Sequence, residues 1–321
     1  MKKYLKSISI LALFFVVSLP FFAQEEIEET PGAAFLEITS DARSASLGGI
    51  NSSVMPGALS VFGNAASSIF ASEKIGVGAS LSARKDFSDA NLYSVGGYYN
   101  LDDKNSISVG FRHFSNPEME LSKGKTFKPT EMAFDLAYTR KLLDGLSLAL
   151  TARLVNSDMM GTGAGSASSF GGDLGVYYEN NLNSFSGGKW NVGLQVSNFG
   201  AKLKYNNGEF DLPTRLKAGG SAFLPFSEDH KVLFTANVAY RMLPSDFSTF
   251  ECGLGAEYNL YKYGFLRAGY HIGDESTGFG NFATLGVGAS VKGFKIDAAY
   301  WAGAPDQDFK NILFFTLSAA F

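Results

Sequence analysis

The sequence is poor in the residues that most catalytic and metal sites use. Its 321 residues contain one cysteine and three histidines, and only 18% of them are charged. A single cysteine excludes an intramolecular disulfide framework. His113, His230 and His271 lie far apart in the chain, and none has a second ligand at metal-binding spacing. The net charge is −4, which is opposite in sign to a nucleic-acid-binding surface. We therefore expect no metal, no cofactor and no nucleic-acid partner.

Long apolar runs are also missing, except at the N-terminus. A membrane-spanning helix needs roughly 20 apolar residues in succession. The one stretch that approaches this follows Lys2, Lys3 and Lys6, and it ends near Ala23, a small residue before Gln24. This order is typical of a signal peptide, so residues 1–23 are predicted to direct export and to be removed. Because Gln24 is not cysteine, a lipid anchor is not expected. Any membrane role then belongs to strands.

Glycine and aromatic residues are abundant, with 36 Gly, 29 Phe and 14 Tyr, and from residue 73 onward apolar and polar residues alternate. Between Leu146 and Leu154 every second residue is apolar, which indicates a strand with two different faces. Fourteen such segments are expected. They lie near 73–84, 91–101, 105–115, 130–142, 145–157, 168–180, 188–198, 213–224, 231–242, 248–260, 264–272, 280–291, 294–302 and 309–321.

The connections between these segments alternate in length. Residues 102–104, 143–144, 261–263 and 292–293 form short turns, whereas 116–129, 158–167, 199–212 and 273–279 are longer. Outer-membrane barrels have an even strand number, short periplasmic turns and longer outer loops. The last strand also ends on an aromatic residue, Phe321. We predict an all-β fold, a 14-stranded antiparallel transmembrane β-barrel formed by residues 73–321 in the outer membrane.

A soluble β-sandwich would also show alternation, but both of its sheets need an apolar inner face. Here the second face of each strand carries Gly, Ser, Thr and charged residues, which suits a polar lumen. Tyrosines near strand ends are expected in the interfacial girdles, namely Tyr98, Tyr99, Tyr138, Tyr258 and Tyr300. The charged residues expected to point inward as solvated ion pairs are Arg84, Arg112, Glu131, Asp135, Arg153, Asp173, Glu179, Arg215, Lys217, Arg241, Glu251, Glu257, Arg267, Lys295 and Asp297.

Residues 24–72 do not follow the strand pattern. They begin with an acidic stretch, and Asp41 then precedes small residues and the pair Gly48 and Gly49. This order predicts a short helix capped by Asp41 and ended by the glycines. Because the segment precedes a barrel with a polar lumen, we expect it to form a plug at the mouth or inside. Asp41 and Arg43 should then pair with opposite charges of the barrel wall.

The same segment resembles the opening of the PorV/PorQ family of the bacterial type IX secretion system, whose members have the FadL type of barrel. The family opening, FLxIxxDARxAxLGG, is matched by Phe35, Leu36, Ile38, Asp41, Ala42, Arg43, Ala45, Leu47, Gly48 and Gly49. The family usually shows Asn-Pro-Ala some 15 residues later. Asn64 occupies that place here and is followed by Ala65 and Ala66, without the proline.

The resemblance implies a non-catalytic docking platform. PorV-like members bind the C-terminal signal domain of secreted cargo, sit beside the translocon barrel and shuttle cargo to a surface attachment complex, whereas PorQ-like members anchor a component of that complex. The outer loops are the expected contact sites. The alternative is a FadL-like channel for hydrophobic small molecules, in which inward aromatic residues line a pocket. Those residues are Phe114, Phe223, Phe282, Phe314 and Trp301, and they could equally pack on the plug.

An enzymatic function is a third hypothesis. His271 precedes Asp274, Glu275 and Ser276, a set from which a surface hydrolase could be built at the barrel rim. Catalysis needs a base within hydrogen-bond reach of a nucleophile or water, and sequence adjacency alone does not supply that geometry. We therefore interpret His271 as a lone histidine near the rim and expect no enzyme.

Overall fold

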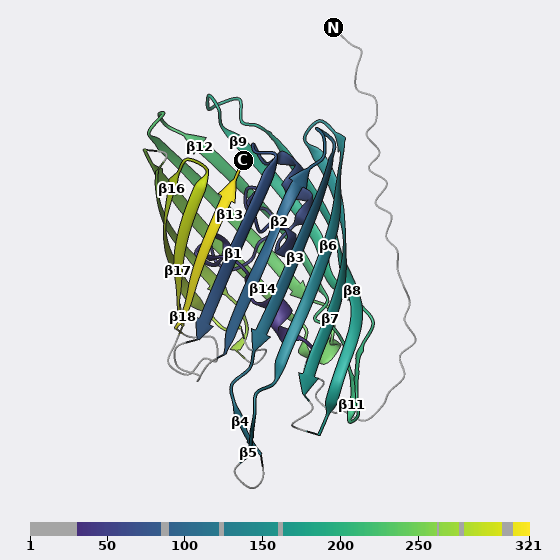
Figure 1. The fold of residues 1–321 in the computed structure, drawn as a ribbon. Coiled ribbons are helices and arrows are strands. Elements are labelled where there is room, and N and C mark those ends of the chain that lie inside the picture. Colours follow the sequence, from purple (N-terminus) through teal and green to yellow (C-terminus); the bar gives the residue numbers. More distant parts are fainter. Residues whose placement is uncertain are drawn as a thin grey trace.

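The protein is a closed antiparallel barrel of fourteen strands, as expected (Figure 1). The computed structural model describes residues 31–84, 90–121, 125–159, 163–261, 263–275, 279–303 and 311–321. The predicted signal peptide and acidic start lie outside these residues. Strands that neighbour one another around the wall follow one another in the chain, and the first strand closes on the last, with Ser80 opposite Thr316.

The barrel strands end within three residues of the predicted segments. Their bounds are β1 (Ile75–Arg84), β2 (Asn91–Asn100), β3 (Asn105–Ser115), β6 (Thr130–Leu143), β7 (Leu146–Met159), β8 (Gly165–Asn181), β9 (Lys189–Gly200), β12 (Arg215–Pro225), β13 (His230–Arg241), β14 (Thr249–Leu260), β15 (Gly264–Ile272), β16 (Phe282–Val291), β17 (Phe294–Gly303) and β18 (Ile312–Ala320).

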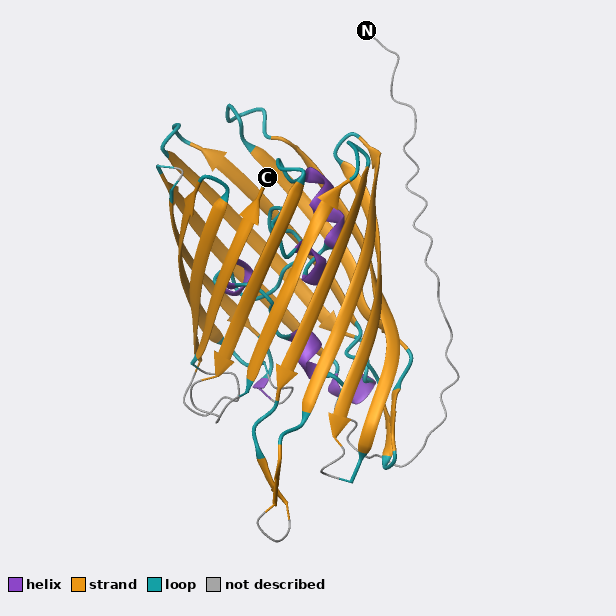
Figure 2. Cartoon of the chain, in the orientation of Figure 1, coloured by secondary structure: helices purple, strands orange, loops and turns teal. Residues whose placement is uncertain are grey.

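Helical structure is short and concentrated before the first strand. It comprises η1 (Ala34–Glu37), α1 (Ala42–Ala45), η2 (Ser60–Phe62) and η3 (Ala65–Phe70), with η5 (Ser245–Phe247) between two strands. Figure 2 shows the helices of the N-terminal segment within the barrel outline. Among the described residues, no helix is long and apolar enough to cross a membrane.

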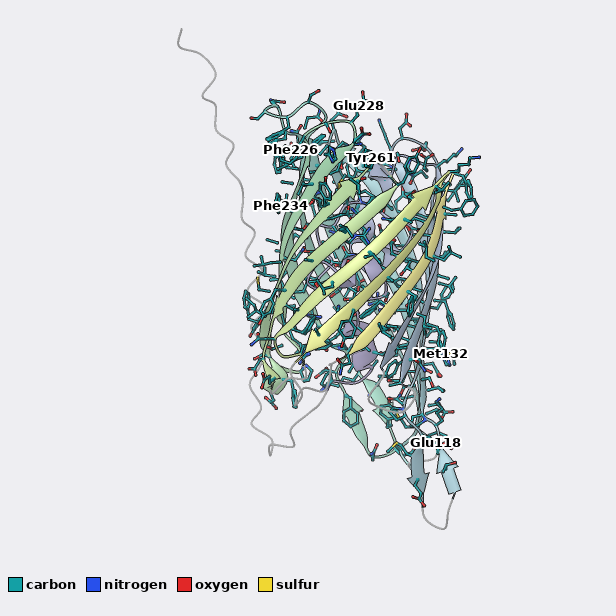
Figure 3. All side chains as sticks on the ribbon, turned by 90° about the vertical axis from the view of Figure 1, so that its left-hand side faces the viewer. Glu118, Met132, Phe226, Glu228, Phe234 and Tyr261 are labelled. Carbon is teal, nitrogen blue, oxygen red and sulfur yellow. The ribbon has the colours of Figure 1, made fainter. Side chains whose placement is uncertain are left out.

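The two rims of the barrel differ. One rim, here called the loop end, carries two hairpins that the sequence pattern did not predict within the long connections (Figure 1). They are β4 (Met119–Leu121) with β5 (Lys125–Phe127), and β10 (Leu203–Tyr205) with β11 (Gly208–Phe210). The other rim, the turn end, carries the tight turns and Phe321. Phe226, Glu228 and Tyr261 lie at the turn end, and Glu118 lies beyond the loop end (Figure 3).

The outer surface of the wall is apolar and the inner surface is polar, as the alternation predicts. Outward side chains such as Phe134, Leu150 and Phe234 are more than half exposed on the isolated chain. In a membrane that exposed surface faces lipid, where apolar side chains are favourable and charge is costly. Inward positions carry serine, threonine, glycine and charged residues, most of them buried.

The prediction that Tyr98 belongs to the interfacial girdle is wrong. Tyr99 and Tyr138 are exposed on the outer surface, but Tyr98 is only 6% exposed and faces inward. Tyr98 lies opposite Gly76 in the pairing of β1 with β2, and its ring occupies the space that a Gly76 side chain would take. The missing Cβ therefore makes room for the ring, a known way to stabilise a glycine in a sheet.

Candidate functional site: the N-terminal segment and the inner wall

The N-terminal segment, residues 31–72, runs inside the barrel from the loop end to the turn end. At the loop end the Gly32 N–H donates to the Asp211 carbonyl oxygen at 2.9 Å. At the turn end Thr139 donates to the Ala65 carbonyl (2.9 Å) and Ser147 to the Ala66 carbonyl (2.6 Å). A backbone hydrogen bond thus holds the segment at the loop end, and two wall side chains hold it at the turn end.

The first motif residues form an apolar cluster at the loop end. Phe35 stacks on Phe114 with ring centroids 6.1 Å apart, and Leu36 and Ile38 are buried in the same cluster as Leu203 of the β10–β11 hairpin. The Leu36 carbonyl accepts a hydrogen bond from Arg112 at 3.4 Å. The hairpin and the segment therefore share one small core at this mouth of the barrel.

The helix that the sequence predicted at Asp41 is present. The Asp41 carboxylate accepts a hydrogen bond from the Ser44 N–H at 2.8 Å, which caps the first turn of α1. After the helix, Gly48 and Gly49 adopt φ values of 89° and 76°. These left-handed conformations strain any residue with a Cβ, so the two glycines end the helix as expected.

We expect Asp41→Ala to destabilise the protein by about 1 kcal/mol, because the Ser44 N–H loses its buried acceptor. Asp41→Asn keeps an acceptor oxygen at the same place and should stay close to the unsubstituted protein. The temperature at which the folded barrel changes its gel migration measures both variants. Equal losses in the two would show that Asp41 acts through its charge and not as a cap.

The small motif residues allow α1 to rest directly on the wall. The Ala42 N–H donates to Thr316 Oγ1 at 2.9 Å, and Trp301 Nε1 donates to the Ala45 carbonyl at 2.8 Å. Phe282, Trp301 and Phe314 form one buried cluster with these two alanines. Phe114 packs on Phe35 at the loop end, and Phe223 packs against the cluster that contains Leu47. The inward aromatic residues thus pack on the segment instead of lining a pocket.

Glycines of the wall receive the backbone of the segment. A Cβ added at Gly255 would lie 2.7 Å from Leu47 Cα, and one at Gly269 would lie 2.7 Å from the Gly48 amide nitrogen. Gly193 and Gly253 also meet segment backbone, whereas the wall glycines that meet segment side chains are Gly96, Gly110, Gly175, Gly219 and Gly286. These wall glycines therefore have a structural role, because a larger residue at each would collide with the segment inside the lumen.

Asn64 joins the segment to itself and to the wall. Its side-chain amide donates to the carbonyls of Ser52 (3.2 Å) and Val176 (2.9 Å), and its oxygen accepts from the Ala66 N–H. Ala65 stands where the family has proline, and it is the first residue of η3, with Asn64 as the N-cap. The departure from the family's Asn-Pro-Ala therefore leaves the cap of this helix intact.

Two charged residues of the segment form bidentate ion pairs with the wall. Arg43 donates through Nε and Nη2 to the two carboxylate oxygens of Glu257, both at 2.9 Å. Arg241 donates in the same manner to Glu37, at 2.9 and 2.8 Å. The expectation for Arg43 is confirmed. That for Asp41 is wrong, because its carboxylate caps α1 and pairs with no wall cation among the described residues.

The wall itself carries a buried ionic row. Arg153 pairs with Asp135 at 2.5 Å and with Asp173 at 2.9 Å, and Arg112 pairs with Asp135 at 3.3 Å. The side chains are at most 5% exposed, so these pairs are buried. The sequence-based expectation of solvated ion pairs is therefore wrong for them. The segment covers them and excludes water. Arg84 lies at the edge of the described residues, and its side chain is outside them.

His271 belongs to this interior. Its Nδ1 lies 3.0 Å from the Gly48 carbonyl oxygen, and its ring stacks on Phe282 with centroids 4.4 Å apart. Only 3% of the residue is exposed, so it is buried against the segment and is not a rim histidine. Ser276 of the hydrolase hypothesis is outside the described residues.

Two contacts of the segment were missed from the sequence. Glu37 occupies a variable position of the motif, and Asn237 is one polar residue among many on inward faces. The Asn237 side-chain oxygen accepts hydrogen bonds from the N–H and hydroxyl groups of both Ser52 and Ser53, at 2.7 to 3.3 Å. For Glu37 the only available signal was a charge between the apolar residues Leu36 and Ile38, and Asn237 gave no signal that distinguished it from other inward polar residues.

The fold is shared with the solved structures of two toluene transporters and of a FadL homologue. The Pseudomonas putida toluene transporter TodX is 14% identical, with a TM-score of 0.58 over 88% of this chain and 96% of that one. The Ralstonia pickettii toluene transporter TbuX is 13% identical, with a TM-score of 0.59 over 89% and 99%. A Pseudomonas aeruginosa FadL homologue is 13% identical, with a TM-score of 0.55 over 91% and 99%.

No curated protein matches the sequence. The sequence model of one family does match, over residues 22–248, and that family is described as the type IX secretion system protein PorV. The matched range contains the N-terminal segment and most of the barrel strands. Since it covers more than two thirds of the sequence, the chain belongs to the PorV family of type IX secretion system proteins, with a FadL-like outer-membrane barrel as its fold.

Proposed function

We propose that this barrel is a non-catalytic docking platform of the type IX secretion system, and that it binds its protein partners at the loop end. The family match carries the proposal. The filled interior supports it, because the N-terminal segment lies against the inner wall, and the outer rim is then the surface left for recognition. Loops on a rigid scaffold are the usual place for such contacts.

The cavities inside the barrel favour docking over transport of hydrophobic molecules. A cavity of about 280 Å³ at the turn end is lined by Asp41, Arg43, Lys295 and Asp297, among other residues. A second one, of about 40 Å³, is lined by Glu37, Arg215 and Lys217, among others. A hydrophobic solute would lose its favourable surroundings beside so many charged groups.

The loop end offers an asymmetric surface. The longest strands, β6, β7 and β8, have 14, 14 and 17 residues, and they stand on the side that also carries the β4–β5 hairpin (Figure 1). Glu118, Met119 and Glu120 are exposed on that hairpin. A partner that approaches from outside meets this raised side first, so we assign the recognition surface to it.

Replacing residues 118–128 by a short Gly-Ser turn should abolish partner capture and leave the barrel folded. The hairpin pairs only with itself, Met119 opposite Phe127, so its removal breaks no barrel ladder. We expect at least a tenfold loss of co-purified translocon or cargo, since a docking surface concentrates its energy in few residues. The matched control replaces residues 226–229 at the turn end. Full capture by the shortened hairpin variant would contradict the assignment.

The nature of the captured protein separates a shuttle from an anchor. A gentle detergent pull-down from outer membranes that recovers the translocon barrel, or cargo with its C-terminal signal domain, indicates a PorV-like shuttle. Recovery of a component of the surface attachment complex indicates a PorQ-like anchor. Deletion of the gene should reduce export or attachment of cargo, and unchanged secretion would contradict the docking function.

The alternative function is a channel for hydrophobic small molecules. It is motivated by the barrel fold shared with TodX and TbuX, which are toluene transporters. Growth on long-chain fatty acids and uptake of a monoaromatic hydrocarbon by cells with and without the gene test it. Faster uptake that requires this chain would favour the channel over the docking platform.

A further inference from the structure

Lys217 is an inward residue of β12 that faces the N-terminal segment across a small cavity. The cavity is about 40 Å³ in volume, and Ser40, Glu37 and Arg215 are among the residues that line it. A cavity needs ~10–15 Å³ to hold one water-sized species, so this one holds one or a few of them. It lies between the wall and the stretch of the segment that leads into α1.

Lys217 differs from the other interior cations in having no partner. Arg43 pairs with Glu257, Arg153 with Asp135 and Asp173, and Arg241 with Glu37. Arg112, Arg215, Arg267 and Lys295 likewise each lie within ion-pair distance of a carboxylate. Lys217 forms no hydrogen bond or ion pair with any residue that the structure describes. An uncompensated charge in such a place is unfavourable.

The neighbouring carboxylates are already engaged. Asp173, which interacts electrostatically with Lys217, accepts hydrogen bonds from Arg153, Gln195 and the Asn198 N–H. Glu37 holds Arg241 through both oxygens and lies 3.5 Å from Arg215 Nε. Asp41 caps α1. Asp41 lines the same cavity, but neither it nor any other described carboxylate lies within ion-pair distance of the Lys217 ammonium.

Two further donors at the cavity make no hydrogen bond. The Ser40 hydroxyl is buried and has no hydrogen-bond partner. Arg215 Nε is buried without a hydrogen bond: its neighbouring carboxylate oxygen, Glu37 Oε1, is 3.5 Å away and already accepts from Arg241, and another nitrogen of the guanidinium pairs with Glu251. Because buried polar groups are almost always satisfied, three donors around one cavity point to a missing acceptor.

We propose that the cavity beside Lys217 binds a small monovalent anion of the size of chloride. The anion accepts from the Lys217 ammonium, the Ser40 hydroxyl and Arg215 Nε, and it neutralises an interior cation that has no ion pair in the described part of the chain. Such charge-assisted bonds to groups on both β12 and the N-terminal segment would fasten the segment to the wall. The cavity is too small for a lipid headgroup or a nucleotide.

The test measures thermal unfolding of the full-length exported protein in detergent, with sodium chloride, sodium bromide or sodium gluconate at equal ionic strength. A ligand that binds only the folded state raises its stability with concentration. We expect chloride and bromide to raise the midpoint in a saturable manner and gluconate, which is too large, to leave it unchanged. Equal midpoints in the three salts would overturn the proposal.

Three variants locate the effect. Lys217→Met should remove the chloride dependence, and in gluconate it should be at least as stable as the unsubstituted protein, since an unpaired buried cation is gone. Ser40→Ala should fold normally and raise the half-saturating chloride concentration about tenfold, the usual effect of one lost hydrogen bond to a charged group. Lys189→Met removes a half-exposed cation paired with Glu179 and should keep the full response.

Bromide provides a direct readout. In crystals grown with sodium bromide, an anomalous peak between Lys217 and Ser40 is expected, and the peak should be absent in the Lys217→Met variant. A chloride response that survives in Lys217→Met, or bromide found only on the outer surface, would show that the anion binds elsewhere and would overturn the proposal.

Discussion

Gly269→Val is expected to lift the N-terminal segment from the barrel wall. An added Cβ at this position would lie 2.7 Å from the Gly48 amide nitrogen and 2.7 Å from the Leu254 carbonyl oxygen. Both atoms belong to backbone, so neither can rotate away, and the cost should reach about 3 kcal/mol. The observable result is a lower temperature for the change in gel migration, together with cleavage by protease between residues 32 and 71.

The matched control is Gly220→Val on the outer face of β12. A Cβ at Gly220 meets the Asn191 carbonyl at 3.4 Å and Val192 at 3.8 Å, which is ordinary contact. Valine there faces lipid and should leave both measurements unchanged. If Gly269→Val and Gly220→Val behaved alike, the close approach of the segment to the wall would not contribute to stability.

The second large effect is expected at the ion pair between Glu37 and Arg241. Each side chain is 1% exposed, and each engages the other through two atoms. Glu37→Met leaves the Arg241 guanidinium buried without its counter-charge, which should cost about 3–5 kcal/mol. Thermal unfolding and the gel-migration change measure the loss, and the segment should become accessible to protease at the loop end.

The double variant Glu37→Met with Arg241→Met separates charge from packing. Replacing both members of a buried pair by apolar residues is often neutral, so most of the lost stability should return. Lys204→Ala serves as a control, because Lys204 and Glu209 form an exposed pair on the β10–β11 hairpin. No change is expected there. A double variant as unstable as Glu37→Met alone would indicate that shape, and not charge, fixes the segment.

Several features of the interior follow from the order of neighbouring residues in the sequence. The cap at Asp41 and the stop at Gly48 and Gly49 were predictable, because both depend on residues within a few positions of one another. The same holds for the inward direction of Arg153 and Asp173. Their burial in a continuous ionic row was not predictable, since it requires the segment to cover them.

Tyr98 and His271 show where local reasoning fails. Both lie near strand ends, where the sequence suggests an interfacial girdle and an exposed rim. Tyr98 instead fills the space above Gly76, and His271 stacks on Phe282 beside the Gly48 carbonyl. In each case the deciding neighbour lies on another part of the chain, and only its position in space accounts for the burial.

The sequence by itself determined the alternating strands, their number and the lengths of their connections, because each depends on neighbours within about ten residues. Tertiary structure decided what fills the lumen. Arg43 meets Glu257 across 214 positions and Trp301 meets Ala45 across 256, distances at which no local pattern carries information. The path of the segment through the lumen decides which inward glycines it meets. The sequence shows only that glycine is abundant. The folded barrel shows why glycine is needed at the wall positions that the segment contacts.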